Sequence, residues 1–267
     1  MGPLHLLAQL VAASLRGQAR YPLSAVTLTL GQFAATGIEM LAVWALFHRF
    51  GPVQGWQMAD VAVFYGLAHV MFAVADALGR GFDVLGSELL RTGQFDRLLL
   101  RPRSLTLQLM GHDLRISRLG RLMQGLLVLA WAASQGAFVW SAGNVAVLLF
   151  AAAGGAALFL GILVLQGTLA FWTVESLELA NVLTYGGVHA AQFPMAVYER
   201  WFRRLLTFGV PLAAVAYYPA LFVMQRPDPL GAPGWLGAVS PLAGLVFLGL
   251  SLLAWCFGVR HYASTGS

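Results

Sequence analysis

Six apolar segments of this chain are each long enough to cross a lipid bilayer. A transmembrane helix needs about 20 predominantly apolar residues. Of the 267 residues, 59% are hydrophobic and only 10% are charged, whereas about 25% of the residues in a soluble domain are charged. We therefore predict one all-α integral membrane domain, residues 1–267, with six transmembrane helices at 23–47, 58–79, 122–140, 145–172, 205–224 and 239–258.

The arginines predict how these helices are oriented. All 16 basic residues are Arg, and eight of them lie between Arg80 and Arg121, in the longest connection. Cytoplasmic connections carry the excess of basic residues in membrane proteins. This rule places the 81–118 connection and both termini in the cytoplasm and leaves only Arg49 and Arg226 outside. The arginines flank apolar segments instead of alternating with stacking aromatics, so we expect no nucleic-acid partner.

The sequence lacks Lys and the common catalytic motifs. Without Lys the chain cannot form a P-loop or a Schiff base, and it contains neither HExxH nor GxSxG. The six histidines lack the spacing of metal ligands, and the single cysteine, Cys256, lies within an apolar run. We predict that the chain is not an enzyme and binds no metal or cofactor, so that any ATP hydrolysis takes place in another chain.

Residues 1–20 have the pattern of a short amphipathic helix. Leu4, Leu7 and Val11 recur at helical spacing. Arg16 and Arg20 follow the apolar stretch, whereas a secretory signal carries its positive charges before it. We therefore expect a helix that lies in the membrane interface.

The segment 175–198 is apolar enough to be a further span. It contains Glu175, Glu178 and Pro194, however, and a crossing here would move the three arginines at 200–204 to the outside. We interpret it as a cytoplasmic extension followed by an interfacial helix.

The connection 81–118 contains a candidate docking helix. Gly93 interrupts the helical pattern, and the amphipathic stretch 94–100 that follows is stopped by Arg101-Pro102. Phe95, Leu98 and Leu99 would form an apolar face suited to a groove on another protein. A solvated loop that contacts lipid headgroups explains the same pattern, and the residues alone leave both readings open.

Three tracts carry a resemblance to a known family. TGQFDRLLLRPRS (Thr92–Ser104), PLAAVAYYPA (Pro211–Ala220) and FGVRHYASTGS (Phe257–Ser267) together resemble the type-2 ABC transporter permeases, in the same order along a chain of similar length. The resemblance implies an amino-terminal elbow helix, a coupling helix in the 81–118 connection and a place in the bacterial cytoplasmic membrane. It also implies two partners, a second permease subunit and two copies of a separate ATPase that binds ATP and Mg²⁺.

The same resemblance implies which residues contact the ATPase. The coupling helix would present Gln94, Phe95, Asp96, Arg97 and Arg101. A second, smaller contact would involve Tyr198, Arg200, Arg203 and Arg204.

Intramembrane polar residues are the candidates for substrate binding, because a charge within the bilayer is costly unless it is paired or solvated. Glu39 would face a substrate cavity together with Phe33 and Trp44, or would be a packing residue held by a hydrogen bond. Tyr217 and Tyr218 are further cavity candidates, with interfacial packing as the alternative.

Three other polar residues have structural interpretations. Asp76 and Arg80, four residues apart, suggest an ion pair on one helix. Asp60 is placed to cap the start of its helix, and His69 to make an interhelical hydrogen bond.

These observations favour the permease subunit of an ATP-driven exporter of lipophilic or amphipathic compounds, including cationic aromatic ones, that works by alternating access. The alternative is a proton-coupled carrier or channel that uses Glu39, Asp60 and Asp76. Import is also compatible with the sequence.

Overall fold

The computed structural model describes residues 12, 14, 16–18, 20–112, 115–173 and 177–262. Every regular element in these ranges is helical, and the only sheet-like pairing within them is an isolated bridge between Val53 and Trp56. The predicted all-α class is confirmed. Most of the expected interfacial helix at 1–20 lies outside the described residues, and so does Glu175.

Four helical segments are long and apolar enough to cross a membrane. They are α2 (Pro22–Phe50), α3 (Met58–Asp83), which continues into the π-helix η1 (Leu85–Leu90), α7 (Ala142–Leu169), and α12 (Leu242–Arg260) together with the short α11 (Leu236–Val239). A fifth candidate is a bent pair of shorter segments. Helix α6 (Arg118–Ser134), which corresponds to the predicted span 122–140, has 17 residues. The described residues therefore support four or five candidate spans, whereas the sequence predicts six.

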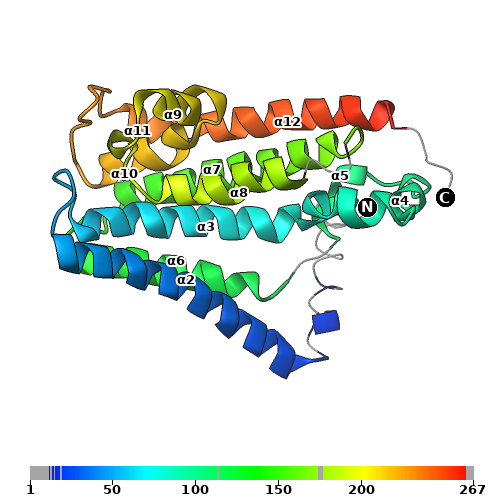
Figure 1. Ribbon diagram of the computed structural model, residues 1–267, viewed down its shortest axis with the longest axis horizontal. Helices are drawn as coiled ribbons and strands as arrows, with labels where there is room; N and C mark the ends of the chain where they lie inside the picture. The colour runs from blue at the N-terminus through cyan, green and yellow to red at the C-terminus, as the bar shows by residue number, and fades with distance from the viewer. Residues whose placement is uncertain are drawn as a thin grey trace.

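The long helices lie side by side along the long axis of the molecule, with α3 between α6 and α7 (Figure 1). Small residues allow these close approaches: a Cβ on Gly66 would collide with Leu129 of α6, and one on Gly155 would collide with Met71 of α3. Phe64, Tyr65 and Phe72 of α3 are almost completely buried. α3 is therefore the central helix of the bundle.

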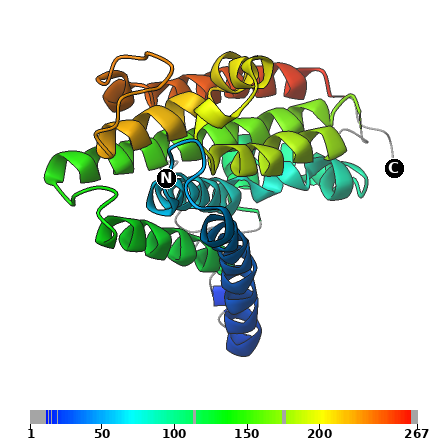
Figure 2. The same ribbon diagram turned by 60° about the vertical axis from the view of Figure 1, so that its left-hand side comes forward.

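Helix α2 leans away from this bundle. Figure 1 shows it diverging from α3, and Figure 2 shows it projecting beneath the other helices. Only Thr36 and Phe47 of its 29 residues are buried. Its closest approach is to α6, where a Cβ on Gly120 would meet the carbonyl oxygen of Thr29.

The two ends of the bundle are built from different elements. One end, here the α4 end, carries η1, α4 (Gln94–Leu99) and α5 (Leu105–Met110) (Figure 1). Gly93 adopts φ 66° at the start of α4, a conformation that glycine adopts readily. The opposite end, here the loop end, carries the connections 51–57 and 224–235.

Helix α8 (Leu177–Ala191) corrects the interpretation of the segment 175–198. It packs lengthwise against α3 and α7, with the ring of Tyr185 5.5 Å from that of Phe72. Val188 and Ala191 are buried, and the Gln192 amide lies 3.1 Å from the His69 ring. The described part of the segment thus runs along the bundle with one side packed against α3 and α7, while Val182 and Tyr185 remain exposed.

The predicted span 205–224 is broken. The 3-10 helix η2 (Met195–Val197) leads into α9 (Arg200–Arg204) and η3 (Leu205–Gly209), and η4 (Ala213–Tyr217) and α10 (Tyr218–Val223) follow. The axes of Arg200–Gly209 and Ala213–Val223 differ by 83°. Pro211 lies at the bend, where it has no backbone N–H to continue a helix. One straight helix over 205–224 is therefore not what this sequence forms.

Candidate coupling and substrate sites

Helix α4 is anchored through one buried aromatic residue. Phe95 has 0% exposed surface, and its ring lies 5.4 Å from Phe171, just after α7, and 5.0 Å from Tyr262, just after α12. The Tyr262 hydroxyl donates a hydrogen bond to Asp96 over 3.1 Å. Phe95 and Asp96 thus attach α4 to the bundle. This corrects the expectation that Phe95 and Leu98, which is also buried, form the docking face.

The exposed face of α4 consists of other residues. Leu99 and Leu100 are 42% and 85% exposed, and Gln94, Arg97 and Arg101 are also exposed. A surface able to dock on another protein is therefore present on α4, but its apolar part is Leu99 and Leu100. The inward position of Phe95 depends on its contact with Tyr262. These two residues are far apart in the chain, so local sequence patterns do not predict the contact.

Helix α5 fixes the other side of α4. The Gln108 side-chain amide donates hydrogen bonds to the carbonyl oxygens of Leu98 and Arg103, at 3.3 and 3.2 Å. These bonds join α5 to the end of α4 and to the turn between the two helices. α4 is thus supported on both sides, which suits an element that transmits force.

The proposed second contact does not lie beside the first. Figure 1 shows α9, which carries Arg200, Arg203 and Arg204, grouped with α10 and α11, away from α4 along the long axis. The Tyr198 hydroxyl donates a hydrogen bond to the Ala190 carbonyl within the bundle. The two segments therefore do not share one end of the bundle in this conformation, and the second coupling contact at 198–204 stays a prediction.

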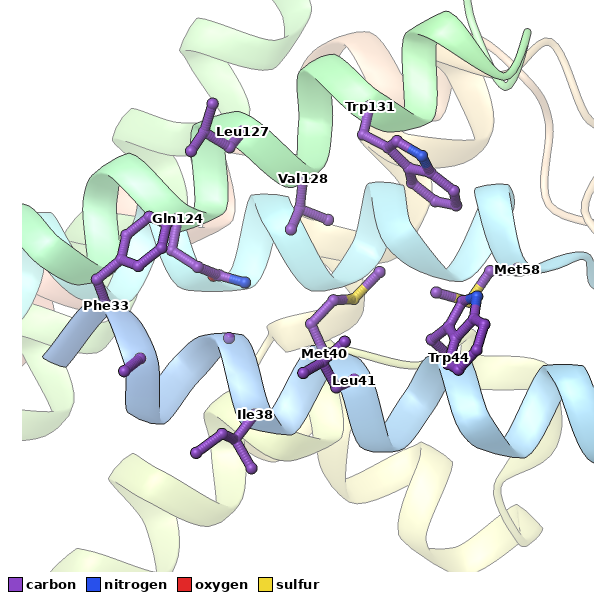
Figure 3. Close-up of a pocket in the computed structure, with 12 residues that line it drawn as sticks. Phe33, Ile38, Met40, Leu41, Trp44, Met58, Gln124, Leu127, Val128 and Trp131 are labelled. Carbon is purple, nitrogen blue, oxygen red and sulfur yellow. The ribbon is translucent and has the colours of Figure 1, made fainter. Parts of the chain in front are cut away.

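A groove of about 650 Å³ runs between α2, α3 and α6. Figure 3 shows Phe33, Met40 and Trp44 of α2 opposite residues of α6, including Val128 and Trp131. Gln124 is the only lining residue with a polar side chain apart from the tryptophan N–H groups. The predicted cavity residues Phe33 and Trp44 therefore do line a cavity, and its walls are almost entirely apolar.

The other cavity candidates lie elsewhere. Glu39 does not line the groove, and its Oε2 lies 3.6 Å from Nε2 of the buried His69, a distance too long for a hydrogen bond. Tyr217 is buried near the loop end, where its hydroxyl donates to Asp228 over 2.7 Å. Tyr218 lines a space of only about 20 Å³. The structure thus separates Glu39, Tyr217 and Tyr218 from Phe33 and Trp44.

The family of the chain follows from a comparison with models of protein families. The model described as "ABC-2 family transporter protein" matches residues 33–266, which is most of the chain. The chain belongs to the ABC-2 transporter family. It is a multi-pass membrane component of an ABC transporter, and the family implies association with an ABC ATPase subunit. No curated protein and no solved structure matches the chain.

Three carboxylates of α3 in this ABC-2 chain are paired with arginines. Asp60 accepts a hydrogen bond from the Gln57 backbone N–H, as predicted for a cap, and lies 2.9 Å from Arg226. Asp76 pairs with Arg118 of α6 at 2.8 Å, while Arg80 pairs with Asp83. The expected pair between Asp76 and Arg80 is therefore wrong, because α6 supplies a partner that the local spacing does not show.

These pairs also bear on proton transfer through the ABC-2 subunit. Asp60 and Asp76 are 16 positions apart on α3, which corresponds to about 24 Å along a helix. A relay of protons needs groups within hydrogen-bonding reach of one another or of intervening water. Each of the two carboxylates is instead held by its own arginine, an arrangement typical of structural ion pairs.

Proposed function

We propose that the chain is the permease subunit of an ATP-driven ABC exporter in the bacterial cytoplasmic membrane, with its termini and α4 end in the cytoplasm. ATP and Mg²⁺ bind to a separate ATPase subunit, present in two copies, and a second permease subunit, identical or different, completes the pathway. The observation that carries the proposal is α4, a supported helix with an exposed face at one end of an ABC-2 bundle.

The distribution of arginines supports this orientation. The α4 end holds Arg91, Arg97, Arg101 and Arg103 around α4, and Arg260 at the end of α12, whereas α9 with its three arginines lies away from this end (Figure 1). The positive-inside rule places such an end in the cytoplasm. The absence of Lys from the chain agrees with ATP hydrolysis by a partner, because a P-loop requires that residue.

The groove supports lipophilic or amphipathic substrates. Its lining from α2 and α6 presents aromatic and aliphatic side chains and no charged one, so the transfer of an apolar molecule from water into the groove is favourable. Trp44 and Trp131 also provide faces for cationic aromatic compounds through cation–π contacts. Glu39 faces His69 and does not line the groove, so we assign it no part in substrate binding.

The packing suggests which parts move during alternating access. Helix α4 is joined by Phe95 and Tyr262 to α7 and α12, whereas α2 buries only two residues. Closure of the ATPases would shift α4 together with α3, α7 and α12 as one body, and α2 would change its angle to α6. Such a change opens or closes the groove.

Co-purification tests the proposal. The chain is expressed with its cognate ATPase subunit, extracted in detergent and purified through a tag on the permease. We expect the ATPase to co-purify and to hydrolyse ATP in a vanadate-sensitive reaction that the permease stimulates. A permease that elutes alone and drives proton-dependent flux by itself would contradict the proposal.

A further inference from the structure

A polar pocket of about 280 Å³ lies on the exposed side of α4. Its lining residues are Leu89, Gln94, Arg97, Leu98, Arg101 and His112. Leu89 and Leu98 are 1% and 7% exposed and form its apolar floor. The other four residues are exposed and carry hydrogen-bond donors. The pocket therefore has an apolar floor and a rim of side chains with N–H donors.

The rim is complementary to an anion. Arg97 lies on α4 and Arg101 just after its carboxyl end, and both side chains line the pocket. Within the described ranges, neither guanidinium has an ion-pair partner, and Asp96, the acidic residue of α4, is engaged by Tyr262. A guanidinium binds a carboxylate through two parallel hydrogen bonds. The two arginines are thus available for one carboxylate between them.

Apolar surface lies next to this anion-binding rim. Leu100 is 85% exposed and Leu99 42% exposed, in a segment that lies at the extreme of the long axis of the bundle (Figure 1). Exposed leucines beside arginines are typical of a surface that another protein covers. Lipid headgroups would be contacted more readily from the flank of the bundle than from its tip.

We propose that this pocket receives an acidic side chain, Asp or Glu, of the partner ATPase, while Leu99 and Leu100 pack against an apolar wall beside that acid. The inference rests on the proposed function, and it specifies the chemistry of the ATPase surface. The carboxylate enters between Arg97 and Arg101, with Gln94 and His112 as further donors. The ATPase cleft is therefore acidic at its centre and apolar at one edge.

Charge reversal in nanodiscs tests this proposal. Arg97→Glu and Arg101→Glu change the pocket, and Arg103→Glu is the matched control, because Arg103 is exposed on the same connection and does not line the pocket. The affinity of each permease for the purified ATPase subunit is measured in zwitterionic lipid. We expect Kd to rise about tenfold or more for each pocket variant, as is usual when one partner of a buried charge pair is lost, and less than about twofold for the control.

Two further measurements keep the outcome unambiguous. Arg97→Gln, which removes the positive charge without adding a negative one, controls for misfolding and should weaken binding less than Arg97→Glu. A single Glu→Arg or Asp→Arg substitution in the ATPase should restore binding to the Arg97→Glu or Arg101→Glu permease, whereas the Arg103→Glu permease has no lost binding to restore.

Three results would overturn the inference. Equal losses in the pocket and control variants would show only a general charge effect. A loss that appears in anionic but not in zwitterionic nanodiscs would assign the pocket to lipid headgroups. Unchanged affinity in every variant would show that the pocket takes no part in docking, and would leave the proposed function intact. A wild-type permease that fails to bind the ATPase would overturn the proposed function itself.

Discussion

The hydroxyl of Tyr262 donates a hydrogen bond to Asp96 over 3.1 Å, between residues 166 positions apart in the chain. This contact joins two of the tracts that carry the family resemblance, one in the 81–118 connection and one at the carboxyl end. With the Phe95, Phe171 and Tyr262 rings packed around it, it ties α4 to the ends of α7 and α12. A displacement of α4 is therefore passed to the helices that pack on α3.

Loss of this contact should loosen α4 without unfolding the bundle. Tyr262→Phe removes one hydrogen bond, worth about 1 kcal/mol, and keeps the ring. Tyr262→Ala also removes the ring from Phe95, and we expect hydrogen exchange of the α4 backbone amides to accelerate more than tenfold, against a few-fold in Tyr262→Phe. His261→Ala, which alters an exposed neighbour, is the control. Equal exchange rates in all four proteins would show that Tyr262 does not hold α4.

The close approach of α2 and α6 depends on Gly120. A Cβ at this position would meet the Thr29 carbonyl oxygen and lie 2.9 Å from the Phe33 backbone nitrogen. Gly120→Ala should therefore lower the melting temperature by several degrees, since overpacking costs about 1–3 kcal/mol.

Gly31→Ala is the matched control for this variant, because nothing lies within 4 Å of a Cβ there and Ala favours the helix by about 1 kcal/mol. Intrinsic tryptophan fluorescence in detergent follows both melts. If Gly120→Ala melted at or above the wild-type temperature, α2 and α6 would not be in contact as described.

The ion pair between Arg226 and Asp60 connects the 224–235 connection to the start of α3 at the loop end. Their charged atoms lie 2.9 Å apart, and the Asp60 side chain is 6% exposed while that of Arg226 is 35% exposed. Because water screens the partly exposed arginine, we expect a coupling energy of about 1 kcal/mol in a double-mutant cycle of Asp60→Asn and Arg226→Gln.

The individual variants should differ in this cycle. Asp60→Asn also weakens the cap that Asp60 makes to the Gln57 N–H, so its melting temperature should fall further than that of Arg226→Gln. Strict additivity of the two effects would mean that the pair is not formed.

Transport assays can separate the groove from Glu39. Phe33→Ala and Trp44→Ala remove apolar lining from the groove, and burial of each aromatic contact contributes about 1–3 kcal/mol. We expect the KM for lipophilic compounds to rise about 5- to 100-fold in these variants.

Glu39→Gln is the informative comparison, because Glu39 lies beside His69 and does not line the groove. It should leave the preference between cationic and neutral compounds unchanged. A selective loss of cation transport in Glu39→Gln would place this carboxylate in the substrate path.

The sequence predicts local features of this fold well. The lengths of the apolar segments predict the bounds of α2, α3, α7 and α12 to within a few residues. The glycine at position 93 predicts where α4 begins. Asp60 caps its helix as expected, and His69 makes an interhelical contact to Gln192. All of these depend on neighbours in the chain or on the period of a helix.

Features that depend on distant partners are the ones that the sequence does not reveal. The amphipathic pattern around Phe95 predicts an apolar face but cannot tell that Phe171 and Tyr262 cover it. The charges of the segment 175–198 suggest an interface, whereas Gln192 finds His69 within the bundle. The partner of Asp76 is Arg118, on another helix, and local spacing favours Arg80 instead.

The most direct test of an ATP-driven mechanism is flux in proteoliposomes that contain the permease with its ATPase, loaded with ATP and held without a pH gradient. We predict that uptake or release of a fluorescent lipophilic compound requires ATP and the ATPase subunit, is blocked by vanadate and is unaffected by a protonophore. Flux that persists without the ATPase and collapses on addition of the protonophore would contradict the account.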